Sequence, residues 1–245
     1  MGHEFQGDNR AEVPATVDEV WTAIATGPGI ESWFMGHGEV TDTRVTLDCG
    51  VFRMDHDITT SEPKARFAFA APTAADGRFI AYEFLIEGRG QGSTVVRMVT
   101  SGFLPGDDWE AEYEAMTLGG ALFWSTLVEY LHHFPGSTAT PVTAFGPVVT
   151  DWVDGWARVR RELGLGDDVH EGDRVTATLH GLPPIDGVVY FGNPHTLGIR
   201  TDGAMYRFVQ GFFGPLMVSH HLFDTTLATT TTEAAWADWL NQVFA

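Results

Sequence analysis

Short runs in which apolar and charged residues alternate constrain the fold of this chain more than any other feature of the sequence. One parity is mainly apolar and carries Phe52, Met54, His56 and Ile58 in one run and Tyr82, Phe84 and Ile86 in another. The opposite parity is charged and carries Arg53, Asp55, Asp57, Glu83 and Glu87. Because successive side chains of a strand point to opposite faces, the pattern predicts an antiparallel sheet with one solvated and one apolar face.

The apolar face of such a sheet needs a cover, and a long helix is predicted directly after the last strand. The segment from Gly120 to Phe134 contains no proline and is followed by Pro135. Residues suited to a buried face recur at helical spacing at Met116, Gly120, Phe123, Leu127 and Leu131, and the stripe is widened by Trp124, Val128 and Tyr130. We expect the helix to begin near Asp107 and Asp108, whose carboxylates suit a helix N-terminus.

Local signals also divide the chain. Thr16 followed three residues later by Glu19 is a capping box, which predicts a helix after an opening strand at 3–13. Proline, glycine, serine and threonine interrupt the periodic pattern from Pro135 to Pro147 and predict a linker. We therefore expect two domains, 1–136 and 145–245, of which the second repeats the order of the first in shortened form.

Two segments resemble a known superfamily. The opening VPATVDEVWTAIATGPGIESWF is similar to the start of START-like proteins, also called SRPBCC proteins. The segment SGFLPGDDWEAEYEAMTLGGALFWSTLVEYLHH resembles the closing part of the branch that contains the Aha-type activator of a heat-shock chaperone ATPase, although here Ala121, not an aromatic residue, follows the small-residue break. The resemblance covers about 4–134. It implies an α+β helix-grip fold, in which a curved antiparallel sheet surrounds a long C-terminal helix and leaves a cavity between them.

The region 145–245 resembles the accessory region attached to such domains in some bacterial proteins. We interpret it as a second, smaller α+β region. One form of this interpretation is a degenerate helix-grip unit that lacks the first strand and the pair of short helices.

Composition limits the classes of partner. The chain has 14 Lys and Arg against 33 Asp and Glu, a net charge of −19, so binding to nucleic acid or to anionic membrane surfaces is not expected. Cys49 is the single cysteine, which excludes an intrachain disulfide and a cysteine-based zinc site. A signal-peptide pattern and a long apolar run are both lacking, and arginine far outnumbers lysine, so we expect a cytoplasmic bacterial protein.

The cavity that the resemblance implies gives the leading functional hypothesis, the binding of a small hydrophobic molecule. Its expected lining is mainly aromatic and consists of Trp33, Phe52, Met54, His56, Phe67, Phe69, Tyr82, Phe84, Met98, Phe123, Trp124 and Leu127. Each of these positions could equally belong to an ordinary core, and His56 could be a core histidine whose hydrogen bonds are satisfied.

Two alternatives stay open from the sequence. The resemblance to the Aha-type branch implies a chaperone partner and a protein-interaction module. Other relatives, the polyketide aromatases and cyclases, use the same cavity for catalysis, and His56 or Tyr82 would then be the acid or base. We expect binding rather than catalysis, because the sequence contains no established catalytic signature.

Neither a metal nor a cofactor is expected. The pairs His132-His133 and His220-His221 suggest metal ligands at first sight. Adjacent residues diverge on a helix and point to opposite faces of a strand, so neither pair can chelate a metal alone. The oligomeric state does not follow from the sequence.

Overall fold

The structure is a computed structural model that describes residues 2–211 and 214–245, with the side chains of 91, 229 and 230 left aside. The chain divides into two compact units. The first consists of Met1–Thr117 and Thr126–Thr138, and the second of Leu118–Ser125 and Ala139–Ala245. Each unit contains one antiparallel sheet, which confirms the predicted α+β class. None of the helices in the described ranges is long and apolar enough to cross a membrane.

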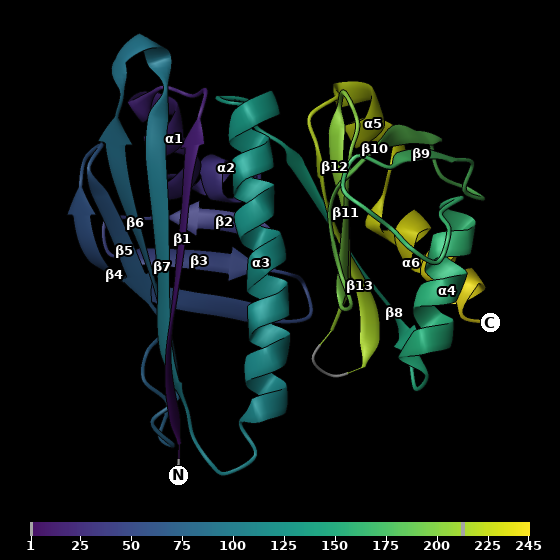
Figure 1. Cartoon of the computed structure of the whole chain (residues 1–245), viewed down its shortest axis with the longest axis horizontal. Helices are drawn as coiled ribbons and strands as arrows, with labels where there is room; N and C mark the ends of the chain where they lie inside the picture. The colour runs from purple at the N-terminus through teal and green to yellow at the C-terminus, as the bar shows by residue number, and fades with distance from the viewer. Residues whose placement is uncertain (1, 212–213) are drawn as a thin grey trace. The chain divides into compact units, whose positions relative to one another are not determined.

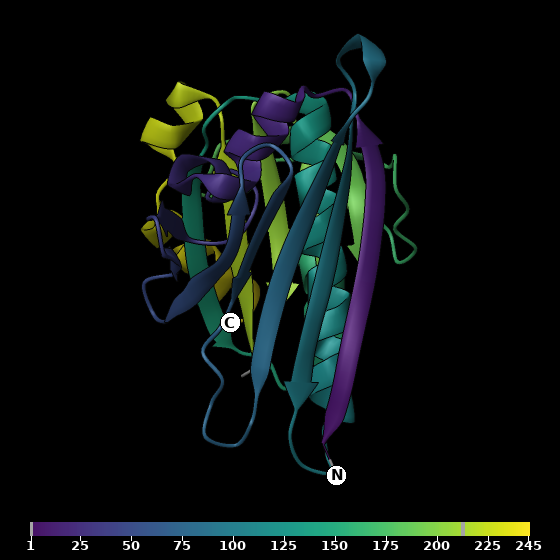
Figure 2. The ribbon, with the colours of Figure 1, turned by 90° about the vertical axis from the view of Figure 1, so that its left-hand side faces the viewer.

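The first unit begins with a strand and two short helices and ends with a long helix (Figure 1). Its elements are β1 (His3–Val13), α1 (Val17–Ala25), α2 (Gly27–Ile30), β2 (His37–Val40), β3 (Arg44–Asp48), β4 (Arg53–Glu62), β5 (Arg66–Ala70), β6 (Phe79–Gly88), β7 (Thr94–Leu104) and the two ends of α3 (Glu110–His133), whose middle, Leu118–Ser125, groups with the second unit. The strand order is β1-β7-β6-β5-β4-β3-β2, so the first strand closes onto the last one. Figure 2 shows the long strands β1, β7 and β6 side by side. This arrangement is consistent with a helix-grip fold.

The helix starts follow local chemistry. The Thr16 side chain accepts a hydrogen bond from the backbone of Glu19, and the Glu19 carboxylate accepts one from the backbone of Thr16, so the predicted capping box is present. Helix α3 begins at Glu110, and Trp109, its N-cap, makes no side-chain cap bond. The acidic residues of its first turn are therefore Glu110 and Glu112 rather than Asp107 and Asp108.

The alternation in β4 and β6 is confirmed, with one exception. His56 and Phe84 are buried, whereas Asp57 and Glu87 are exposed. Phe52 was expected on the apolar face, but it is 41% exposed and precedes β4. The reason is the turn between β3 and β4, which closes through a hydrogen bond from the Cys49 backbone N–H to the Phe52 carbonyl.

The second unit has a similar but shorter order of elements, in which the described residues form one helix instead of two after the first strand. Its elements are β8 (Thr140–Val148), α4 (Trp152–Glu162), β9 (Arg174–Ala177), β10 (Ile185–Asn193), β11 (Thr196–Arg200), β12 (Ala204–Gln210), β13 (Pro215–Leu222), α5 (Thr225–Thr230) and α6 (Glu233–Val243). The sheet order is β8-β13-β12-β11-β10-β9, so its first strand again closes onto its last.

Strand β8 corrects two expectations from the sequence. The second unit does not lack a first strand, and most of the expected linker at 135–147 is paired with β13. Prolines at 141 and 147 did not prevent this, because β8 is an edge strand, where a missing backbone donor is tolerated.

Candidate functional site

One face of the first sheet contacts the start of α3, and we call it the inner face. On β1 it carries the odd-numbered residues from His3 to Val13, because His3 stacks on Trp109 at 3.7 Å between ring centroids and Phe5 lies 5.6 Å from Tyr113 of α3. Strand pairing extends this face across the sheet. Gly7 is paired with Thr100, Thr100 with Tyr82, and Tyr82 with Phe69.

A cluster of aromatic rings covers the middle of the inner face. Phe84 is 1% exposed and lies 6.0 Å from Trp33 and 6.2 Å from Phe69, measured between ring centroids. The Trp33 indole N–H donates to the Ala23 carbonyl at 2.9 Å, which ties the cluster to α1. Phe67 and Phe69 are also buried. These rings form a rigid apolar floor.

His56 lies at the edge of this floor with an unsatisfied ring nitrogen. It is 4% exposed, and its ring centroid lies 5.4 Å from that of Phe69 and 6.1 Å from that of Tyr82. Its Nδ1 atom is buried and has no hydrogen-bond partner in the described part of the chain. Burial lowers the pKa of the imidazole, and the nearby charges of Asp55 and Asp57 oppose that shift. His56 is therefore neutral at pH 7 and keeps one donor and one acceptor.

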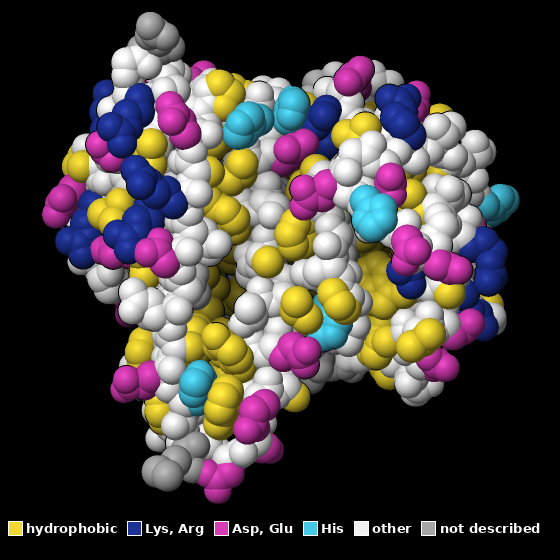
Figure 3. Space-filling model, viewed as in Figure 1, with side chains coloured by type: hydrophobic (Ala, Val, Ile, Leu, Met, Phe, Trp, Pro, Cys, Tyr) yellow, Lys and Arg dark blue, Asp and Glu magenta, His cyan; other side chains and the backbone are white. Residues whose placement is uncertain are grey.

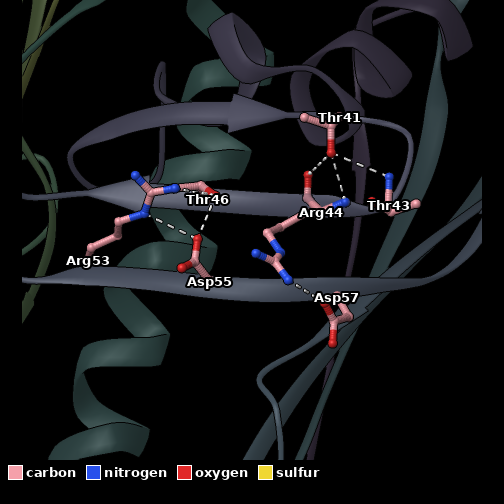
Figure 4. A network of polar contacts seen from close by, with 7 residues as sticks. All are labelled: Thr41, Thr43, Arg44, Thr46, Arg53, Asp55 and Asp57. Carbon is pink, nitrogen blue, oxygen red and sulfur yellow. Dashed lines mark hydrogen bonds and ion pairs between the residues drawn. The ribbon is translucent and has the colours of Figure 1, made fainter.

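The two aspartates that flank His56 point to the other face of the sheet (Figure 4). The Asp55 carboxylate accepts hydrogen bonds from the Thr46 hydroxyl at 2.7 Å and from Arg53 Nε at 3.2 Å. Asp57 pairs with Arg44 at 3.5 Å. Neither carboxylate orients the imidazole, as the alternation in the sequence indicated.

Beyond the aromatic floor, the inner face is only partly covered. Tyr82, Thr100, Gly7 and Asn9 are half-buried. A Cβ atom added at Gly7 would meet no atom within 4 Å. Burial raises the pKa of Tyr82 to about 12, so its hydroxyl is un-ionised and can donate a hydrogen bond.

The other predicted lining residues fall into two groups. Met98 and Leu127 are buried within the first unit, and Met54 is half-buried on β4. Phe123 and Trp124 are half-buried and lie in the part of α3 that groups with the second unit. There the Phe123 ring lies 5.1 Å from the Arg207 guanidinium carbon.

Gly7, Asn9 and Thr100 were not predicted as site residues from the sequence. Residues 3–13 were predicted to form a strand, but the side that faces inward contains glycine and asparagine and therefore gave no sign of an apolar face. Only the pairing of β1 with β7 places these residues beside Tyr82.

Charged groups of the first sheet gather on the outer face. There Arg97 Nε donates to Asp8 at 2.7 Å, Arg66 pairs with Glu83, and Arg10 and Arg89 approach Glu87. Lys and Arg side chains are visible over this face in Figure 3. An open hollow of about 600 Å³ lies here, lined by Asp8, Arg10, Leu85, Ile86, Glu87, Val95 and Arg97. Its charges are exposed and already paired with one another, so we consider the inner face the better candidate for a ligand.

In residues 2–211 and 214–245, no group of three or more His, Cys, Asp or Glu side chains is placed to hold a metal ion. His132 Nδ1 lies 2.8 Å from the Val128 carbonyl at the end of α3. His220 Nδ1 accepts the backbone N–H of Arg207 at 3.0 Å. These contacts account for one ring nitrogen of each histidine.

Comparison with known proteins finds similarity among solved structures. No protein-family model matches the chain, and no curated protein matches it significantly. The di-domain ARO/CYC BexL of the BE-7585A biosynthetic pathway is 12% identical, with 98% of this chain and 93% of that chain covered and a TM-score of 0.47. DynU16, from the dynemicin biosynthetic locus, is 19% identical, with coverages of 98% and 96% and a TM-score of 0.43.

A further similar structure covers about half of the chain. The Aha1 dimer from Colwellia psychrerythraea is 18% identical, with 52% of this chain and 96% of that chain covered and a TM-score of 0.42.

Proposed function

We propose that the first unit binds a small, uncharged, largely apolar molecule on the inner face of its sheet. The observation that carries the proposal is the Nδ1 atom of His56, which has no hydrogen-bond partner among the described residues and is buried beside a partly covered surface. A buried polar atom without a partner costs about 1–3 kcal/mol. A ligand that supplies the missing hydrogen bond would recover that free energy.

The surrounding chemistry supports an uncharged ligand. On the inner face, β1, β5, β6 and β7 carry no Asp, Glu, Lys or Arg, so a charged ligand would lose its hydration without gaining an ion pair. Aromatic rings and a few hydrogen-bonding groups are the usual composition of a small-molecule site.

The composition of the chain also supports the accompanying prediction of a cytoplasmic bacterial protein.

The test is binding of a neutral fluorescent probe, N-phenyl-1-naphthylamine, to the purified protein, followed by native mass spectrometry to find a co-purified ligand. We expect saturable fluorescence that is lost when Tyr82 is replaced by Trp, which would fill the space beside Thr100. Replacing Glu83, which is half-buried on the outer face of the same strand, by Gln is the matched control. Absence of saturable binding by the unaltered protein would reject the proposal.

A second candidate is catalysis at the same site, as in the cyclase-type hypothesis. It is favoured by one observation, the neutral imidazole of His56 next to the un-ionised hydroxyl of Tyr82. These two groups could exchange a proton with a bound substrate. Conversion of a co-purified molecule by the unaltered protein, but not by a His56→Leu variant that still binds it, would favour catalysis over binding. The chaperone-activator hypothesis stays a prediction.

A further inference from the structure

Resting on the proposed function, we infer that the ligand is elongated and lies across β6, β7 and β1, and that Gly7 provides the space for its far end. The polar end of the ligand would lie at His56 and Tyr82. Its apolar end would reach the edge strand β1. Gly7 is then a specificity-determining residue that sets the length of molecule the site accepts.

The strand pairing defines the direction of this path. Tyr82, Thr100 and Gly7 are directly paired across three neighbouring strands, so their side-chain positions form one row on the inner face. Neighbouring strands lie about 4.8 Å apart, so the row extends about 10 Å from Tyr82 to Gly7. The Thr100 hydroxyl, midway along the row, offers one further hydrogen bond.

The usual reasons for a glycine inside a strand do not apply to Gly7. It is not among the glycines with a positive φ, so the backbone does not require it. Close packing does not require it either, because an added Cβ would meet nothing within 4 Å. A glycine in a strand interior costs stability relative to residues with a side chain. The open space that it leaves is therefore its distinguishing property.

The neighbouring inner-face glycine shows that this opening is local. Gly102, one row further along β7, is opposite Phe5, and a Cβ added there would lie 2.5 Å from the Phe5 ring. The inner face is thus filled at Phe5 and open at Gly7. Because β1 is an edge of the sheet, the open end of the row lies at the border of the site.

The test compares two neutral probes on two variants. The rod-shaped probe is 1,6-diphenyl-1,3,5-hexatriene, and the compact probe is N-phenyl-1-naphthylamine. Gly7→Val places a branched side chain in the open space, and Gln6→Val makes the matched change on the opposite, exposed face of the same strand. Circular dichroism and thermal unfolding establish that both variants are folded.

We expect Gly7→Val to weaken binding of the rod-shaped probe about tenfold or more and binding of the compact probe less than about twofold. The reason is that carbon atoms added to an apolar site discriminate between ligands on this scale. Gln6→Val should alter neither affinity. Unchanged binding of the rod, or an equal loss of both probes, would overturn the role of Gly7 while the proposed function stands. Failure of the unaltered protein to bind either probe would overturn the proposed function itself, and this inference with it.

Discussion

The Nδ1 atom of His220 accepts a hydrogen bond from the backbone N–H of Arg207 at 3.0 Å, between the adjacent strands β13 and β12. The Arg207 guanidinium turns to the same strand and donates to the Ser219 carbonyl at 2.8 Å and to the Ser219 hydroxyl at 2.7 Å. The His220 ring is fully buried, with its centroid 4.1 Å from that of Trp236. A proton on Nδ1 would break the first bond and place a second charge beside Arg207.

We predict that this arrangement makes the second unit sensitive to acid. Burial, together with the charge of Arg207, lowers the pKa of His220 well below its usual value. The unfolded chain therefore binds a proton near pH 6.5 that the folded chain does not, and the free energy of unfolding falls as pH decreases below about 6.5. Urea unfolding followed by tryptophan fluorescence at about pH 7.5 and about pH 5.5 measures this loss.

The variant His220→Asn retains an acceptor near the Nδ1 position but cannot be protonated. We expect it to lose less stability between the two pH values than the unaltered protein does. His132→Asn, at an exposed histidine, is the control and should keep the original difference. An equal pH dependence in all three proteins would contradict the role of His220.

A second prediction concerns the unsatisfied nitrogen of His56. Replacing His56 by Leu removes a buried polar atom that has no partner among the described residues, so the free energy of unfolding at pH 7 should rise by up to about 1–3 kcal/mol. The same change should reduce the preference of the site for 1-naphthol over naphthalene by about tenfold, since one hydrogen bond is lost. Asp57→Asn, on the exposed face, should alter neither quantity. A destabilised His56→Leu variant with unaltered preference would show that His56 serves the core alone.

The third prediction compares the loss of stability when a fully buried ring of the aromatic cluster is truncated with the loss when a half-buried side chain is changed. Phe84→Ala should cost about 3–5 kcal/mol of unfolding free energy, because this ring is 1% exposed and packed against Trp33 and Phe69. Tyr82→Phe should cost less than about 1 kcal/mol, since it removes only a hydroxyl group. Both values come from denaturant unfolding. Similar costs for the two changes would mean that Tyr82 is as tightly held as Phe84.

The fourth prediction concerns the boundary between the predicted domains 1–136 and 145–245. Residues 136–138 are exposed, whereas 140–148 form β8 and are paired with β13. Limited proteolysis should therefore cut first at 136–138, and mass spectrometry of the fragments locates the site. Another exposed loop of the first unit, 72–76, serves as the internal comparison. A first cut inside 140–148 would show that β8 opens more easily than its pairing indicates.

The sequence was sufficient for features that depend on neighbours along the chain. Alternation assigned His56 and Asp57 to opposite faces of a strand, and the Thr16–Glu19 pair located the start of α1. These features could be predicted because side-chain direction in a strand and cap bonding in a helix are set within a few residues. The wide apolar stripe of α3 was also visible, but the sequence could not divide its residues between the two units.

Tertiary structure decided what depends on strands far apart in the sequence. The pairing of β1 with β7 brings Gly7 beside Thr100 and Tyr82, and the pairing of β8 with β13 turns a proline-containing linker into a strand. Tertiary structure also decided that His56 Nδ1 has no hydrogen-bond partner in the described part of the chain, because this depends on every group packed around the ring. The sequence by itself thus determined the elements and the faces of their strands. Long-range strand pairing alone determined which inner-face groups meet and where space is left between them. The reason is that no local rule fixes the distance between residues about 75 to 95 positions apart in the chain.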